Sequence, residues 1–255
     1  MDSEIAKKFI SIAKNQGLSF RLSTAVKQAK SSNTGVRLIL ESADGGVEET
    51  VAADIALVSV GRLPATDGLG LEAAGISLTE RGCIAVDSRF ETSLDDVFAI
   101  GDVIEGPMLA HKAEEDAVAA VEIMAGKPGH VDYNLVPGIV YTAPEIATLG
   151  ATEEALIEAA IDYKKGLFPF LANSRAKATG HTDGFVKILA DAKTDRVLGC
   201  HIIAHEAGTL IHEVATAMAF GASSEDIART CHGHPTMNEA VKEAALAVDG
   251  RAIHI

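Results

Sequence analysis

Two histidines, a proline and a glutamate stand close together near the end of the chain, in the stretch "CHGHPTMNEA" at 231–240. A glutamate that accepts a hydrogen bond from one imidazole nitrogen would fix the tautomer of the ring while the other nitrogen takes or gives a proton. A structural role fits the same stretch, because Thr236 and Glu239 have the Thr-x-x-Glu spacing of a capping box at the start of a final helix.

A second candidate site is the Gly101-Asp102 pair, which ends the apolar run "VFAIGDV". A buried strand that ends in this way brings a backbone without a side chain close to a ligand and places a carboxylate beside it. Cofactors bind at the carboxyl ends of such strands, and a carboxylate suits ribose or ribityl hydroxyls. A capping role for Asp102 in the next turn is the alternative.

The cysteines predict neither a disulfide framework nor a zinc site. Cys83, Cys200 and Cys231 lie far apart and form no Cys-x-x-Cys pair. A metal site made of Cys231, His232 and His234 lacks a fourth ligand at the usual spacing. We therefore expect no metal and a reducing compartment, namely the cytoplasm or an equivalent such as the mitochondrial matrix.

The composition excludes several classes of protein. The 255 residues are 47% hydrophobic, which is enough for the core of one large domain or two ordinary ones. The formal net charge of −14 argues against a nucleic-acid-binding surface. No apolar run approaches the roughly 20 residues of a membrane helix, so we expect no membrane partner. The opening residues have the spacing of an amphipathic helix and not the apolar centre of a signal peptide.

The elements that would position these residues fall into three blocks. In the first, the pattern over 5–20 predicts a helix closed by Gly17, and strands are expected at 36–42 and 53–61, with a turn at 43–46. The strand at 53–61 is nearly all apolar, which is typical of a strand buried on both faces.

The second block holds the apolar strand at 97–103 and a helix that begins near Met108. The third block starts near Tyr133 and mixes strands with helices at a spacing that predicts an antiparallel sheet covered by helices. Its strands are expected at 138–142, 162–168, 184–190 and 196–204, and its helices at 206–221, 223–228 and 237–248.

Several segments resemble one family of flavoenzymes. The stretch "TSLDDVFAIGDV" resembles the flavin-binding signature of the two-dinucleotide-domain flavoprotein reductases, and "LVSVGRLPAT" looks like the end of their nicotinamide-cofactor domain. The segments "GPMLAHKAEEDA" and "FPFLANSRAKA" are similar to dihydrolipoamide dehydrogenases in particular. "HPT…E" matches the active-site histidine motif of the pyridine nucleotide–disulfide oxidoreductases.

The resemblance implies an α/β fold that is the C-terminal part of an NAD-binding and FAD-binding flavoprotein, followed by an α+β interface domain with an antiparallel sheet. It implies an NAD-domain part at 1–62, a central FAD-binding segment at 63–132 and a dimerisation domain at 133–255. The GxGxxG loops and the Cys-x-x-x-x-Cys of complete members do not occur in these 255 residues. The chain therefore looks like the C-terminal half of such an enzyme.

The same resemblance assigns roles to individual residues. His234 would be the base and Glu239 its partner, with His232 in support and a cis peptide bond before Pro235. The cofactor-binding positions would be Asp102, the helix start at Met108, Leu109, Ala110 and His111, and also Gly61 and Val26.

The activity implied by the resemblance is dihydrolipoyl dehydrogenase, which oxidises protein-bound dihydrolipoamide with FAD and NAD as cofactors. The partners would be a second copy of the chain and the lipoyl domain of a 2-oxoacid dehydrogenase or glycine cleavage complex. The chain alone, lacking the redox disulfide, is expected to be inactive. The alternatives are a non-catalytic dimerisation or partner-binding fragment, and another disulfide reductase of the same family.

Overall fold

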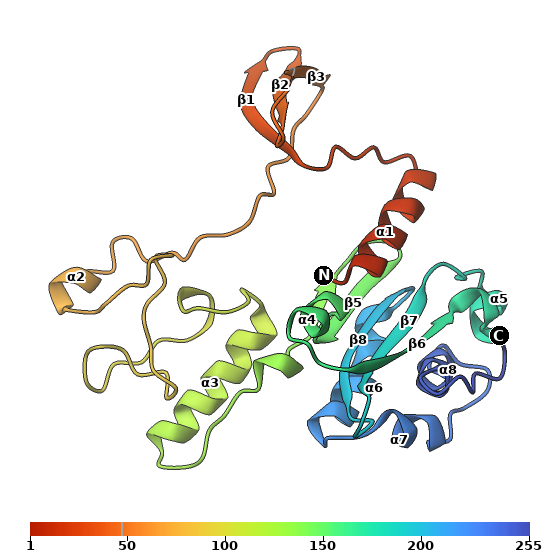
Figure 1. Cartoon of the computed structure of the whole chain (residues 1–255). Coiled ribbons are helices and arrows are strands. Elements are labelled where there is room, and N and C mark those ends of the chain that lie inside the picture. The colour runs from red at the N-terminus through yellow and green to blue at the C-terminus, as the bar shows by residue number, and fades with distance from the viewer. Residues whose placement is uncertain (47) are drawn as a thin grey trace.

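The computed structural model describes residues 1–46 and 48–255, and its largest body is a five-stranded antiparallel sheet (Figure 1). The strand order is β4-β5-β8-β7-β6, and the β7–β8 hairpin turns through 192–196. The antiparallel sheet predicted for the third block is thereby confirmed, although β5 was not predicted. The strands are β4 Gly138–Val140, β5 Glu145–Gly150, β6 Tyr163–Pro169, β7 Phe185–Asp191 and β8 Val197–Ala204.

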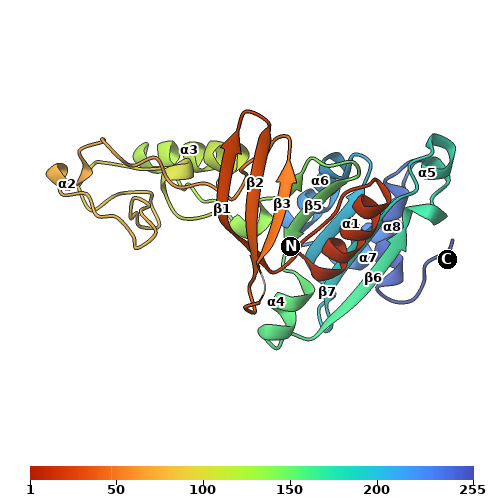
Figure 2. The same cartoon turned by 90° about the horizontal axis from the view of Figure 1, so that it is seen from above.

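One face of this sheet packs against the C-terminal helices (Figures 1 and 2). Alternate side chains of β7 and β8, such as Val186, Ile188 and Ile202, point to this face and are fully buried. An apolar stripe of α6 meets them through Leu210 and Val214. The helices here are α6 Ala207–Ala219, α7 Ser224–Arg229 and α8 Glu239–Ala247, and the shorter α5 Ser174–Thr179 follows β6 and the 3₁₀ helix η3 Phe170–Ala172.

Helix α8 rests directly on strand β6 at Gly166. A Cβ atom at this position would lie 2.0 Å from the carbonyl oxygen of Ala244 and 2.6 Å from the backbone nitrogen of Val248. The backbones of the strand and the helix therefore touch without a side chain between them. This contact sets the distance between the sheet and α8, the helix that carries Glu239.

The opposite face of the sheet is covered by helix α1, Ser3–Asn15, from the other end of the chain (Figure 2). Ile5 and Ile12, two turns apart on one side of α1, pack against Phe185 and Ile203. The helix ends as predicted, because Gly17 has a φ of +93°, and the N–H of Leu18 reaches the carbonyl of Ala13 in a Schellman arrangement.

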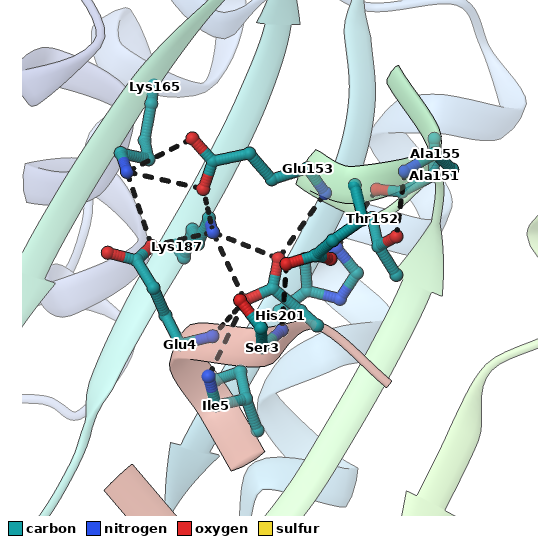
Figure 3. A network of polar contacts seen from close by, with 12 residues as sticks. Ser3, Glu4, Ile5, Ala151, Thr152, Glu153, Ala155, Lys165, Lys187 and His201 are labelled. Carbon is teal, nitrogen blue, oxygen red and sulfur yellow. Dashed lines mark hydrogen bonds and ion pairs between the residues drawn. The ribbon is translucent and has the colours of Figure 1, made fainter. Parts of the chain in front are cut away.

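Charged side chains fill the rest of this interface, around Lys187 in the middle of β7 (Figure 3). The fully buried ammonium lies 2.9 Å from Asp2 Oδ2, 2.5 Å from Glu153 Oε2 and 2.6 Å from Glu4 Oε2. Asp2 also caps two helices, because it accepts from the N–H groups of Glu4 and Ile5 in α1 and from that of Glu153 in α4, Glu153–Glu158. One carboxylate thus satisfies two helix N-termini and one cation.

The protonation equilibria reflect this arrangement. Burial opposes the ionisation of Glu153, but hydrogen bonds from Lys187, Tyr163 and Lys165 outweigh it and lower the pKa of this carboxyl to about 2. Burial likewise opposes the charge of Lys187, yet its carboxylate partners raise its pKa above the ordinary value. Burial lowers the pKa of His201, whose Nε2 bonds to the carbonyl of Ala151 at the edge of the cluster.

The first half of the chain forms smaller bodies (Figure 1). A three-stranded antiparallel sheet has the order β1-β2-β3, and helix α3 packs over the apolar cluster formed by residues such as Ile84, Phe90 and Ile104. None of the helices among the described residues is both long and apolar enough to cross a bilayer. The elements are β1 Thr24–Ser32, β2 Gly35–Ser42, β3 Glu49–Ala53, α2 Leu71–Ala74, α3 Ala110–Met124 and the 3₁₀ helices η1 Gly101–Val103 and η2 Tyr133–Leu135.

Two strand predictions are wrong. From Asp54 onward, the segment expected as a strand at 53–61 has no regular structure, and its apolar side chains are exposed, Leu57 at 90% and Val60 at 92%. The run at 97–103 makes a single bridge, at Phe98, and then the 3₁₀ helix η1. A strand needs neighbouring strands for its backbone hydrogen bonds, and no strand in the described part of the chain lies beside either segment.

Removal of the Lys187 ammonium should destabilise the fold strongly. In Lys187→Ala, Asp2 stays buried without its cation, and breaking a buried ion pair in this way costs about 3–5 kcal/mol. Urea unfolding followed by circular dichroism measures the loss. Lys164→Ala, on the neighbouring strand β6, removes a surface ion pair with Asp249; it is the matched control and should change little. Equal stabilities of the two variants would contradict the account.

The fold should also lose stability in acid through Glu153. Its pKa is about 2 in the folded chain against an ordinary 4.5, so the unfolded chain binds more protons between these values and stability falls as the pH drops through this window. Urea midpoints measured from pH 5 to pH 2 should decline less steeply in Glu153→Gln. An identical slope in the two proteins would show that this carboxyl does not titrate as described.

Candidate active site

The loop between α7 and α8, residues 230–238, carries His234, and the predicted pairing with Glu239 is confirmed. The Nδ1 atom of His234 lies 2.9 Å from Glu239 Oε1. The peptide bond between His234 and Pro235 is cis, as predicted. Two hydrogen bonds stabilise the loop. Thr236 Oγ1 donates to the carbonyl of Gly233, and Asn173 Nδ2 donates to the carbonyl of Thr236.

The helix-capping and proton-transfer interpretations of Glu239 are compatible. Its Oε2 accepts from the backbone N–H of Thr236 at 2.9 Å, as in one half of a capping box, although α8 begins at Glu239 with Asn238 and not Thr236 as its N-cap. The Thr236 hydroxyl is turned to Gly233, so the other half does not form. Burial opposes the ionisation of Glu239, but the Thr236 N–H and the His234 imidazole outweigh it and lower the pKa of this carboxyl.

This geometry decides which imidazole nitrogen can react. A carboxylate only accepts hydrogen bonds, so Nδ1 of His234 carries the proton that faces Glu239 and Nε2 keeps its lone pair. The His234 side chain is 66% exposed, and Nε2 has no hydrogen-bond partner among the described residues. The pair can therefore take a proton at Nε2 while Glu239 stabilises the imidazolium.

A second histidine–glutamate pair lies beside the first. Glu243, one turn further along α8, is 4% exposed and accepts from His254 Nδ1 at 2.7 Å and from the backbone N–H of Ile253 at 2.8 Å. This buried carboxylate holds the C-terminal tail against the helix. A small cavity is lined by both pairs together with Phe168, Ala172, Asn173 and Ser174.

The Gly101-Asp102 pair is held by a buried ion pair on α3. The N–H of Gly101 donates to Asp116 Oδ2, and its carbonyl accepts from Lys112 Nζ, which lies 2.7 Å from the same carboxylate. The Tyr133 hydroxyl donates to the other oxygen of Asp116, and burial together with this bond raises the pKa of Tyr133. The Asp102 side chain is left exposed at the surface.

The start of α3 lies against this loop. Gly101 has a φ of +74°, and a Cβ atom there would be 3.1 Å from the Cβ of Ala113, so both the backbone conformation and the close approach to the helix favour glycine. The helix begins at Ala110 with Leu109 as N-cap and has no side-chain cap, which leaves its first N–H groups for another partner. His111 is engaged elsewhere, because its Nε2 bonds to the carbonyl of Pro137.

The remaining predicted positions are not assembled into one site. Gly61 lies in the exposed irregular segment, and Val26, 59% exposed, lies on β1. The cavity at His234 is lined by 168–174, α8 and the tail, and by no residue of the Gly101 loop. Among the described residues no group of three or more His, Cys, Asp or Glu side chains could hold a metal ion.

The sequence did not predict the buried Lys112–Asp116 pair, although a signal was present. The two residues are four apart and share the buried stripe of α3 with Ala119, Ala120 and Ile123. Two opposite charges at this spacing inside an apolar stripe indicate a buried pair.

Comparisons with known proteins extend over the whole chain. Residues 1–117 match the family model of the pyridine nucleotide-disulphide oxidoreductases, and residues 136–245 match the model of the dimerisation domain of the same family. The mitochondrial dihydrolipoyl dehydrogenase of Pisum sativum is 54% identical over all 255 residues, and that of Sus scrofa is 52% identical over 256 aligned residues.

The chain spans about half the length of the curated relatives it matches, 51% of the pea protein and 50% of the pig protein. A leghemoglobin reductase of Glycine max is 55% identical over 97% of the chain and 47% of its own length. Among solved structures, LpdA from Mycobacterium tuberculosis superposes with a TM-score of 0.87 at 27% identity, covering 96% of this chain and 52% of that one.

Loss of the Asp116 charge should loosen the Gly101 loop. In Asp116→Asn, the Lys112 ammonium stays buried without its counter-ion, at a cost of about 3–5 kcal/mol. Hydrogen exchange at Gly101 should accelerate, and thermal unfolding should occur at lower temperature. Glu114→Gln, an exposed change on the same helix, should leave both measurements as they are. Unchanged exchange at Gly101 in Asp116→Asn would refute the anchoring role.

Proposed function

Because this chain belongs to the pyridine nucleotide-disulphide oxidoreductase family, we propose that it supplies the base and the dimer interface of a dihydrolipoyl dehydrogenase. Such an enzyme oxidises protein-bound dihydrolipoamide to lipoamide and passes the electrons through a disulfide and FAD to NAD. The observation that supports this most directly is the His234–Glu239 pair, in which Nδ1 lies 2.9 Å from Glu239 Oε1 and the His234 side chain is 66% exposed.

His234 takes the proton of the substrate thiol in this proposal. The S–H bond of dihydrolipoamide breaks, an N–H bond forms at Nε2, and the electron pair stays on sulfur as the thiolate, which is the nucleophile of disulfide exchange. Glu239 stabilises the imidazolium that results and keeps the ring in the tautomer that can accept. The proton leaves from Nε2 when the ring returns to its neutral form.

The Gly101 loop and the start of α3 fit the role of flavin-binding residues. Asp102 offers an exposed carboxylate for ribityl hydroxyls, and the uncapped N–H groups of Ala110 and His111 at the start of α3, at the positive end of the helix dipole, favour a negatively charged ring edge. Met108 and Leu109 lead into this helix start. When bound, FAD supplies two-electron acceptor chemistry. Gly61 and Val26 remain proposed cofactor contacts, but they lie on separate elements, and we derive no step through NAD.

The site requires groups beyond one copy of this chain. Cys83, Cys200 and Cys231 are free, and the first two are buried, so we place the redox disulfide outside these 255 residues. The match to a dimerisation domain supports a homodimer. We propose the lipoyl domain of a 2-oxoacid dehydrogenase or glycine cleavage complex as the second partner and, from the mitochondrial relatives, the mitochondrial matrix as the compartment.

A dimerisation or partner-binding module without catalysis is the second candidate, because 54–63 and other apolar surfaces of this chain are exposed. Another disulfide reductase of the family is the third. Purified full-length protein decides between the first two, since an enzyme shows a flavin absorption band and a binding module is colourless. An assay that compares the oxidation rates of dihydrolipoamide and of other dithiol substrates tests the third candidate.

Replacement of the base should cost most of the activity. In the full-length enzyme, His234→Gln should lower the rate of dihydrolipoamide oxidation by about 10² to 10⁴, the usual contribution of a positioned base. The rate is measured by following the absorption of the reduced nicotinamide as NAD is reduced. His181→Gln, an exposed histidine near another cavity, is the control and should retain full turnover. Full turnover of His234→Gln would exclude His234 as the base.

A further inference from the structure

One carboxylate, Glu213 on α6, contacts both ends of the loop that carries His234. Its Oε1 lies 2.5 Å from Nε2 of His232, two positions before His234. Its Oε2 accepts from Nδ2 of Asn238, four positions after His234, at 2.7 Å. Both oxygens of Glu213 are thus bonded to the loop, and α6 itself packs in the core of the sheet domain.

His232 has little freedom to move within this arrangement. Its side chain is 6% exposed, and its second nitrogen, Nδ1, lies 2.9 Å from the carbonyl oxygen of Thr230. The two neighbours are a carbonyl and a carboxylate, so each ring nitrogen of His232 faces a hydrogen-bond acceptor. Lys242 Nζ also donates to the carbonyl of Thr230.

His234 differs from His232 in the way it is held. The His234 ring is 66% exposed and has Glu239 as its single hydrogen-bond partner among the described residues. The direction of its Nε2 therefore depends on the backbone of the loop. A displacement of about 1 Å at a reacting group can lower a rate by about 10².

We propose that Glu213, His232 and Asn238 form a positioning clamp for His234. The clamp does not touch the substrate; it fixes the loop at both ends so that Nε2 is aimed before the thiol arrives. This inference rests on the proposed role of His234 as base. It assigns to His232 a positioning role that differs from those of a metal ligand and of a second base.

The test uses the full-length enzyme and a double-mutant cycle. Glu213→Gln removes the charge and should lower kcat about 10- to 100-fold with a smaller change in KM, because the defect lies in aiming the base. In a His234→Gln background the same change should have no further effect, since groups that act through one residue are not additive. Glu225→Gln, a surface glutamate bonded to Arg229 and Arg251, is the matched control and should be without effect.

A second pair of variants guards against loss of folding in Glu213→Gln. Asn238→Ala removes one arm of the clamp only, and His232→Gln removes the other. Each should lower kcat several-fold in the wild-type background and leave His234→Gln unchanged. Conversely, Glu213→Asp keeps the charge and should restore part of the rate lost in Glu213→Gln.

The outcomes separate this inference from the proposed function. If Glu213→Gln lowers kcat by the same factor in the His234→Gln background as in the wild type, its effect is independent of His234. That result would overturn the clamp and leave the proposed role of His234 as base in place. Wild-type kcat in both Asn238→Ala and His232→Gln would overturn it as well. Full activity of His234→Gln would instead overturn the proposed function, and the clamp with it.

Discussion

The ammonium of Lys187 is the interaction on which the arrangement of the sheet domain depends. A buried cation is stable only where carboxylates surround it, and those carboxylates come from Asp2 and Glu4 at the start of α1 and from Glu153 at the start of α4. Asp2 also satisfies N–H groups of both helices. The position of one side chain in β7 therefore fixes where two helices begin, one of them 185 residues away in the sequence.

The same strand connects this cluster to the candidate site. Side chains of β7 alternate between faces, so Lys187 faces α1 while Val186 and Ile188 face the layer of α6 and α8. The charged face orders the N-terminal helix, and the apolar face supports the helices that carry Glu213 and Glu239. The two faces of one sheet thus serve different purposes: the polar network attaches a distant segment on one side, and the apolar core supports the His234–Glu239 pair on the other.

Features of the fold and of the site were predicted from the sequence where the interacting residues lie close together in the chain. The end of α1 at Gly17 and the His234–Glu239 pair were predicted because each depends on residues within a few positions of one another. The expected strands at 53–61 and 97–103 failed because a strand depends on neighbours that its own sequence does not specify. The Lys187 cluster and the Glu213 contacts were missed for the same reason, since their partners meet only after folding.

The position of Glu239 depends on Gly166, a residue outside the His234–Glu239 pair. The backbone of β6 is ordinary extended chain there, so the need for glycine comes from the carbonyl of Ala244 above it and not from a special φ. Any side chain at this position would lift α8 from the sheet and carry Glu239 with it. A single added methyl group at 166 would therefore leave His234 and Glu239 unchanged in the sequence and still displace the carboxylate that orients the imidazole.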